Sequence, residues 1–186
     1  LKLSRIKMKK KINIVIKIPD DIECNIDGKK VIVSGKNGKL EQELDPLIEI
    51  QKDDDRLLIF KERAGKKERK IAGTMAAKIK NLIKGIQEGF TYKLKVAYSH
   101  FPMRVEFDSV KRIVMIKNFL GERRVREAVV LPNVDIKVHS EVIEIKSIDK
   151  EAAGQSAANI EKATKVRRKD IRIFQDGIYI FSKPGR

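Results

Sequence analysis

The chain has 186 residues and 41% hydrophobic content, enough for one or two domains with a modest core. Lysine and arginine number 42 against 26 acidic residues, and the formal net charge of +16 favours a polyanionic partner. Cys24 is the single cysteine, which excludes an intramolecular disulfide and fits a reducing cytoplasm, and no apolar run is long enough to span a membrane.

The first predicted element is a strand that follows a basic segment. Residues 1–17 carry seven basic side chains and no acidic one. In the stretch KINIVIKI, residues 11–18, apolar residues recur with period two. Its apolar part is short, contains a lysine and lacks a small-residue cleavage site, so it does not fit a signal peptide. We therefore predict a basic N-terminal arm over residues 1–11, followed by a strand.

Hairpins are predicted after the first strand. Asp27-Gly28 is expected to close one turn, and Asn37-Gly38 is expected to join the strands VIVSG and KLEQEL, because these residue types tolerate positive φ. The runs LIEIQ and LLIFK form a further pair around KDDDR. We interpret KDDDR as a solvated turn rather than a metal site, because consecutive side chains in a turn point in different directions.

A helix is predicted over about residues 67–86. Gly73 and Ala76 lie within its apolar stripe or beside it, and small residues there are expected to let the helix pack closely on a sheet. The apolar residues that fall on one face at helical spacing are Ile71, Met75, Ile79, Leu82, Ile83 and Ile86.

The chain contains an internal repeat. The stretch AGTMAAKI, from Ala72, returns 81 residues later as AGQSAANI, from Ala153, and Lys36-Asn37 matches Lys117-Asn118 at the same offset. Between these anchors the second copy has a longer hairpin around NFLGERR. The repeat predicts a duplicated module with its join near residues 88–93.

The second copy repeats the plan of the first. Strands are predicted in TYKLKVAYS, RVEFD, RIVMIK, RVREAVV, DIKVH and VIEIK. A second helix is predicted over about residues 149–163, with Asp149 or Ser147 as its N-cap. Its buried side is expected to carry Ala153, Ala157 and Ile160.

These elements predict an α+β fold made of two tandem duplicated modules. Each module is expected to be an antiparallel β-sheet packed with one main α-helix. We place the N-terminal module at residues 12–90 and the C-terminal module, with its basic C-terminal segment, at residues 91–186.

Catalytic motifs are not found in the sequence. There is no P-loop and no G-x-S-x-G, and one cysteine cannot form a thiolate zinc cage. His139 is expected in an exposed turn, and His100, which precedes a proline turn, is expected to be structural. We therefore predict no catalytic residue, no metal site, no cofactor and no small-molecule substrate.

Nucleic-acid binding has stronger support. Residues 111–126 carry six basic and one acidic side chain, and residues 162–186 carry eight and two, so both segments can neutralise phosphates. Aromatic content of 5% favours docking on folded RNA by shape and backbone over base stacking on a sheet. The predicted RNA-binding residues are Lys117, Arg123, Arg124, Arg126, Lys165, Arg167, Arg168, Lys169, Arg172, Lys183 and Arg186.

Four stretches resemble large-subunit ribosomal protein six in its archaeal and eukaryotic form. They are IDGKKVIVSGKNGKLEQEL, VAYSHFPM, IDKEAAGQSAANIEKAT and RRKDIRIFQDGIYI, and the resemblance extends in order from about Ile12 to Phe181. It implies a non-enzymatic component of the large ribosomal subunit in the cytoplasm, with neighbouring large-subunit proteins as partners. It also implies binding to large-subunit ribosomal RNA, mainly through the C-terminal module, near the base of the stalk that recruits translational GTPases.

Two alternatives to a ribosomal protein stay open from the sequence. One is an RNA-processing enzyme with His100 and nearby acids at its site. The other is a general nucleic-acid compaction protein, for which the excess of basic residues would suffice.

Overall fold

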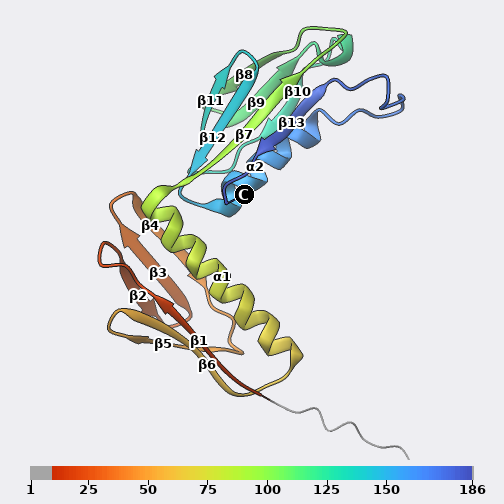
Figure 1. Ribbon diagram of the computed structural model, residues 1–186. Helices are drawn as coiled ribbons and strands as arrows, with labels where there is room; N and C mark the ends of the chain where they lie inside the picture. The colour runs from red at the N-terminus through yellow and green to blue at the C-terminus, as the bar shows by residue number, and fades with distance from the viewer. Residues whose placement is uncertain (1–9, 186) are drawn as a thin grey trace, which may run out of the picture. The chain divides into compact units, whose positions relative to one another are not determined.

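The computed structural model describes residues 10–185, and the chain divides into two compact units between Glu88 and Gly89 (Figure 1). Each unit contains two antiparallel sheets and one main helix. The predicted α+β class and the duplicated modules are confirmed, although each module has two sheets where one was expected. Within residues 10–185, neither main helix is long and apolar enough to cross a lipid bilayer.

The first unit is built from six strands and a long helix. One sheet has the order β1-β6-β5 and the other the order β2-β3-β4, with neighbouring strands antiparallel in both. The elements are β1 (Lys10–Lys17), β2 (Glu23–Asp27), β3 (Lys30–Gly35), β4 (Gly38–Glu43), β5 (Glu49–Asp53), β6 (Arg56–Ala64) and α1 (Lys66–Glu88).

The second unit repeats this topology and adds one strand. Its sheets have the orders β11-β12-β7-β13 and β10-β9-β8, so β7, β12 and β11 correspond to β1, β6 and β5, and β13 is the addition. The elements are β7 (Phe90–Ala97), β8 (Arg104–Asp108), β9 (Ile113–Lys117), a 3-10 turn η1 (Phe119–Gly121), β10 (Arg126–Val129), β11 (Asp135–His139), β12 (Val142–Ser147), α2 (Lys150–Ala163) and β13 (Gly177–Ser182).

Proline explains why each module has two sheets. Pro19 lies between β1 and β2 and Pro46 between β4 and β5, which are the two places where the first unit passes from one sheet to the other. Pro102 and Pro132 lie at the corresponding crossings of the second unit. Because proline has no N–H to extend a ladder, strand pairing is interrupted at each crossing.

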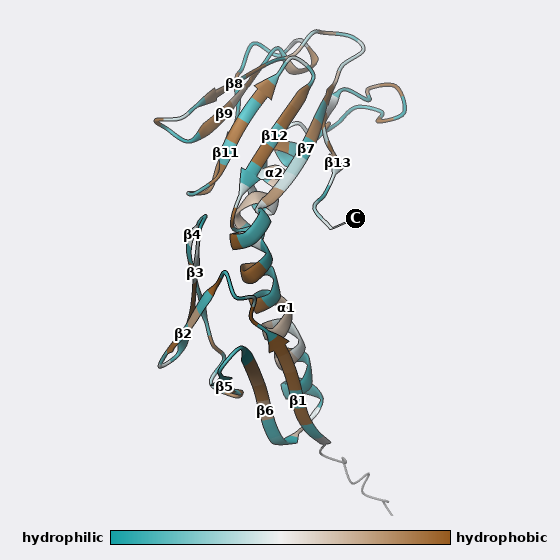
Figure 2. Cartoon of the chain, turned by 60° about the vertical axis from the view of Figure 1, so that its left-hand side comes forward, coloured by the Kyte–Doolittle hydropathy of each residue, from teal (hydrophilic) through white to brown (hydrophobic). Residues whose placement is uncertain are grey.

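The helix α1 packs its apolar face into the core of the first unit. The predicted stripe is confirmed, because Met75, Ile79, Ile83 and Ile86 are buried, and hydrophobic and hydrophilic residues alternate along α1 in Figure 2. Gly73 departs from the prediction. It is exposed, and a Cβ built on it would meet no atom within 4 Å, so close packing does not require glycine there.

The helix α2 packs its small residues into the core of the second unit. Ala153, Ala157 and Ile160 are buried as predicted, and Asp149 is the N-cap, because its side chain accepts a hydrogen bond from the Glu151 amide at 2.8 Å. The glycine of the repeated motif matters in this copy. A Cβ on Gly154 would lie 2.9 Å from Oη of Tyr92.

The turn between β3 and β4 differs from the prediction by one residue. Gly35 pairs with Gly38, so Lys36-Asn37, and not Asn37-Gly38, forms the centre of the turn. The side chain of Asn37 donates hydrogen bonds to the carbonyl oxygens of Ile86 at 2.7 Å and Gln87 at 3.1 Å. Asn37 thereby satisfies carbonyl groups at the end of α1 that have no partner within the helix.

Candidate nucleic-acid interface

The structure brings the two predicted basic segments of the second unit together. Arg126 begins β10, and its Nη1 donates to the carbonyl oxygens of Ala163 at 2.8 Å and Lys165 at 3.4 Å. These carbonyls lie at and just after the end of α2, where the helix leaves acceptors without a partner. Arg126 therefore holds the segment after α2 against the hairpin between β9 and β10.

Other side chains of the hairpin fix the position of Arg126. Glu122 accepts hydrogen bonds from Nε at 2.9 Å and Nη2 at 2.7 Å, and the guanidinium lies 4.2 Å from the centroid of the buried Phe119 ring. The hydrogen bonds from Arg126 lower the pKa of Glu122, against partial burial, which would raise it. The Arg126 side chain is 24% exposed, so its donors serve the fold rather than a phosphate.

A basic groove of about 500 Å³ lies where the two segments meet. Three cationic side chains that line it are free of ion pairs and hydrogen bonds within residues 10–185, namely Arg124, Lys162 and Arg167. Lys162 was not predicted as a site residue, because its place on the last turn of α2 is typical of a solvated helix position.

The predicted RNA-binding residues fall into three groups. One group is exposed and makes no ion pair or hydrogen bond through its side chains within the described part of the chain: Arg123, Arg124, Lys165, Arg167, Arg168 and Lys183. The second group is held by contacts within the protein. Lys117 pairs with Glu106 at 2.7 Å, and Arg172 pairs with Asp170 at 3.1 Å. Lys169 lies over the Phe174 ring, and Arg126 makes the contacts given above. Arg186 lies outside the described residues.

The segment after α2 is supported by a stack of side chains. The Lys169 ammonium lies 4.5 Å from the centroid of the Phe174 ring, and that ring stacks on His100 with centroids 5.0 Å apart. The stack joins the chain after α2 to the turn after β7. His100 thus has a structural role, as the sequence predicts, and the exposed Ile171 of the same segment remains on its surface.

A buried carboxylate anchors the turn after β7. The side chain of Asp176 has no exposed area, and it accepts hydrogen bonds from the amides of Ser99 at 3.0 Å and His100 at 3.4 Å. Nδ1 of His100 lies 3.3 Å from the same carboxylate. Burial alone would raise the pKa of Asp176, but the two amides and the imidazole outweigh it and lower the pKa. This anchor ends β7 before the Tyr-Ser-His turn, two residues earlier than the predicted strand.

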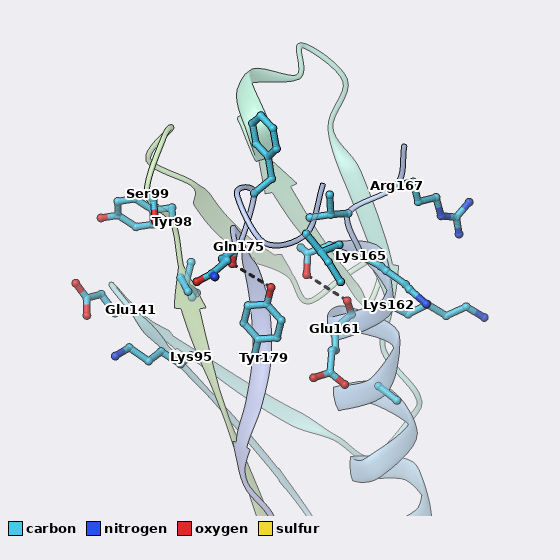
Figure 3. A pocket seen from close by; sticks show the side chains of 17 residues that line it. Lys95, Tyr98, Ser99, Glu141, Glu161, Lys162, Lys165, Arg167, Gln175 and Tyr179 are labelled. Carbon is cyan, nitrogen blue, oxygen red and sulfur yellow. Dashed lines mark hydrogen bonds between the residues drawn. The ribbon is translucent and has the colours of Figure 1, made fainter. Parts of the chain in front are cut away.

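A second and larger groove, of about 1530 Å³, lies beside the segment after α2 (Figure 3). It is lined by the end of β7, the last turns of α2, the segment after α2 and β13. Lys162 and Arg167 line both grooves, so the larger groove adjoins the basic one.

Both units of the chain match one known family. The sequence profile described as ribosomal protein L6 matches residues 18–89 and again residues 101–177, one match in each unit. The chain belongs to the ribosomal protein L6 family. The double match agrees with the internal repeat and with the duplicated topology of the two units.

Curated relatives cover most of the chain. The protein named large ribosomal subunit protein uL6 from Methanothrix thermoacetophila is 47% identical to this chain, and the match covers 89% of this chain and 94% of the relative. The protein of the same name from Staphylothermus marinus is 44% identical, and the match covers 89% of this chain and 91% of the relative. The protein of that name from Methanococcus vannielii is 42% identical, and the match covers 92% of this chain and 93% of the relative. Membership of the L6 family makes the chain a structural protein rather than an enzyme, so the alternative of an RNA-processing enzyme is set aside.

Proposed function

We propose that the chain is a structural component of the large ribosomal subunit that binds and stabilises large-subunit ribosomal RNA. Support for the ribosomal role comes from the L6 family profile and from relatives that are named large ribosomal subunit proteins. The proposal places the chain in the cytoplasm, on the ribosome, with ribosomal RNA and neighbouring large-subunit proteins as its partners.

The observation that carries the RNA-binding part is the convergence of two basic segments at Arg126. Its hydrogen bonds span 37 residues of sequence and join the β9–β10 hairpin to the segment after α2. Free cationic side chains surround this junction, and they can contact phosphates without first breaking an ion pair within the protein. We define this basic surface as Arg123, Arg124, Lys162, Lys165, Arg167 and Arg168.

The finer part of the proposal is a position near the base of the stalk that recruits translational GTPases. The resemblance of VAYSHFPM and of the C-terminal stretch to the family supports it. Both stretches belong to the second unit, where Asp176 joins them by binding the amides of Ser99 and His100. The second unit is therefore proposed to make the main RNA contacts.

The test compares two variants that lose the same charge from different units. In the first, Arg123, Arg124, Arg167 and Arg168 are changed to glutamine, which removes four cations of the basic surface. In the control, four exposed lysines of α1 are changed to glutamine: Lys66, Lys67, Lys70 and Lys80. Affinity for large-subunit ribosomal RNA is measured as a function of salt concentration.

The first variant is expected to lower the slope of log affinity against log salt by about one for each phosphate that the protein no longer neutralises, and the control to change it much less. Equal loss in both variants would contradict a binding surface in the second unit. Equal affinity of the unaltered chain for duplex DNA and ribosomal RNA at matched salt would favour the compaction alternative instead.

A further inference from the structure

Tyr179 is an aromatic side chain fixed on the surface of the second unit. Its hydroxyl donates to the carbonyl oxygen of Gln175 at 3.0 Å, and a Cβ on Gly177 would lie 3.0 Å from Cζ of the ring. The ring therefore lies back along β13 over Gly177, where only glycine leaves room for it. One side of the ring is covered by the strand, and the residue is still 45% exposed.

The strand that carries Tyr179 is held firmly on its neighbours. The amide of Ile178 donates to Oγ1 of Thr164 at 2.9 Å, and the amide of Ile180 donates to Oε1 of Glu161 at 3.1 Å. The residues on either side of Tyr179 thus bind α2 and the chain just after it, while β13 pairs with β7. The position of the ring is set by the fold before any ligand arrives.

Basic side chains outnumber acidic ones in the groove around the ring. Lys95 is directly opposite Tyr179 in the register of β7 and β13, and its side chain makes no ion pair or hydrogen bond within residues 10–185. Figure 3 shows Lys95 and Glu161 on either side of the ring. The groove around Tyr179 contains four basic residues, Lys95, Lys162, Lys165 and Arg167, against two acidic ones, Glu141 and Glu161.

We propose that this groove binds an unpaired nucleotide of RNA, whose base stacks on the exposed side of the Tyr179 ring and whose phosphates contact Lys95 and Lys165. An aromatic ring beside lysines is the arrangement that binds single-stranded nucleic acid, because every base has a face that can stack. The inference rests on the proposed function for the identity of the polymer. It adds a base-stacking site where the sparse aromatic content of the sequence predicted only shape and backbone contacts.

The test uses the full chain and two short oligomers of equal length and charge. One is oligoadenylate, and the other is an abasic oligomer with the same sugar-phosphate backbone. Stacking of one base predicts that oligoadenylate binds roughly 5- to 150-fold more tightly than the abasic oligomer. Lys95→Gln is expected to weaken both oligomers by the same factor, because it removes a charge and no stacking surface.

Variants of Tyr179 assign the preference to the ring. Tyr179→Leu keeps an apolar cover over Gly177 and should abolish the preference for oligoadenylate, whereas Tyr179→Phe should keep most of it. The comparison of oligomers on the unaltered chain needs no variant, so it stands even if Tyr179→Leu does not fold.

Equal binding of both oligomers by the unaltered chain would overturn the stacking site, whatever the salt experiment on folded ribosomal RNA shows. A preference that survives in Tyr179→Leu would also overturn it. Tighter binding of an oligoglutamate peptide than of oligoadenylate would show that the groove takes an acidic protein segment and not RNA.

Discussion

Arg126→Gln should destabilise the second unit without removing a phosphate contact. The change removes a hydrogen bond from a charged donor to Ala163, which contributes about 1.5 kcal/mol. It also removes a partly exposed ion pair with Glu122, about 0.5 kcal/mol, and a cation–π contact with Phe119, about 0.5 kcal/mol. Glutamine can restore part of one contact, so the expected loss is about 2 kcal/mol, or roughly 8–16 °C in Tm for a unit of this size.

The assay follows the second unit separately from the first. The chain has three tyrosines and no tryptophan, and Tyr92, Tyr98 and Tyr179 all lie in the second unit. Tyrosine fluorescence during denaturation therefore reports the unfolding of that unit alone. RNA affinity is measured on the same proteins as a function of salt, at a temperature where both variants are folded.

Arg124→Gln is the matched control, because Arg124 lies two residues away, is exposed and makes no ion pair or hydrogen bond within residues 10–185. It should change stability by less than about 0.5 kcal/mol and lower the salt slope by about one. Arg126→Gln should show the reverse, with lower stability and an unchanged salt slope. Unchanged stability together with a reduced slope for Arg126→Gln would show that Arg126 contacts RNA directly and that its role as a structural link is wrong.

Two further predictions concern packing and a buried charge. Gly73→Ala should stabilise α1 by about 0.5–1 kcal/mol, because the position is exposed and open. Gly154→Ala at the equivalent position of the repeat should bring less stabilisation than Gly73→Ala, because its Cβ would lie 2.9 Å from Oη of Tyr92 and that side chain would have to shift. Calorimetry on both variants checks the difference, and equal effects would contradict the packing. Asp176→Asn should cost about 2 kcal/mol at neutral pH. Since the folded state lowers the pKa of Asp176, this stabilisation is present above the ordinary aspartate pKa and is lost as the pH falls through the lower folded value. The difference in unfolding free energy between Asp176→Asn and the unaltered chain should therefore shrink below about pH 4, and a difference independent of pH would show that the carboxylate charge is not involved.

The periodic features of the fold could be predicted from the sequence. Alternation identified most of the strands, although not β2 or β13. Helical spacing identified the buried face of α1, and the repeat identified the duplicated modules. The packing role of small residues was predicted correctly for Ala153 and Ala157 and wrongly for Gly73. A small residue shows that close approach is possible, and only the neighbouring surface decides whether it occurs.

The contacts that form the candidate site could not be predicted. Arg126 resembles its neighbours Arg123 and Arg124 in sequence, and the acceptor that links it to the segment after α2 lies 37 residues away at Ala163. Asp176 resembles a turn residue in Gln-Asp-Gly, yet it binds an amide 77 residues away. Such partners depend on how the sheets and α2 pack, and no local pattern in the chain encodes that arrangement.

The most direct test of the central claim is to ask whether the chain stays with the large ribosomal subunit after a high-salt wash. Cells expressing a tagged chain are lysed, the ribosomal subunits are separated by sedimentation, and the large-subunit fraction is washed and probed for the tag. We predict that the unaltered chain remains bound and that the variant lacking Arg123, Arg124, Arg167 and Arg168 is released at lower salt. Absence of the unaltered chain from the washed large subunit would contradict the proposed function.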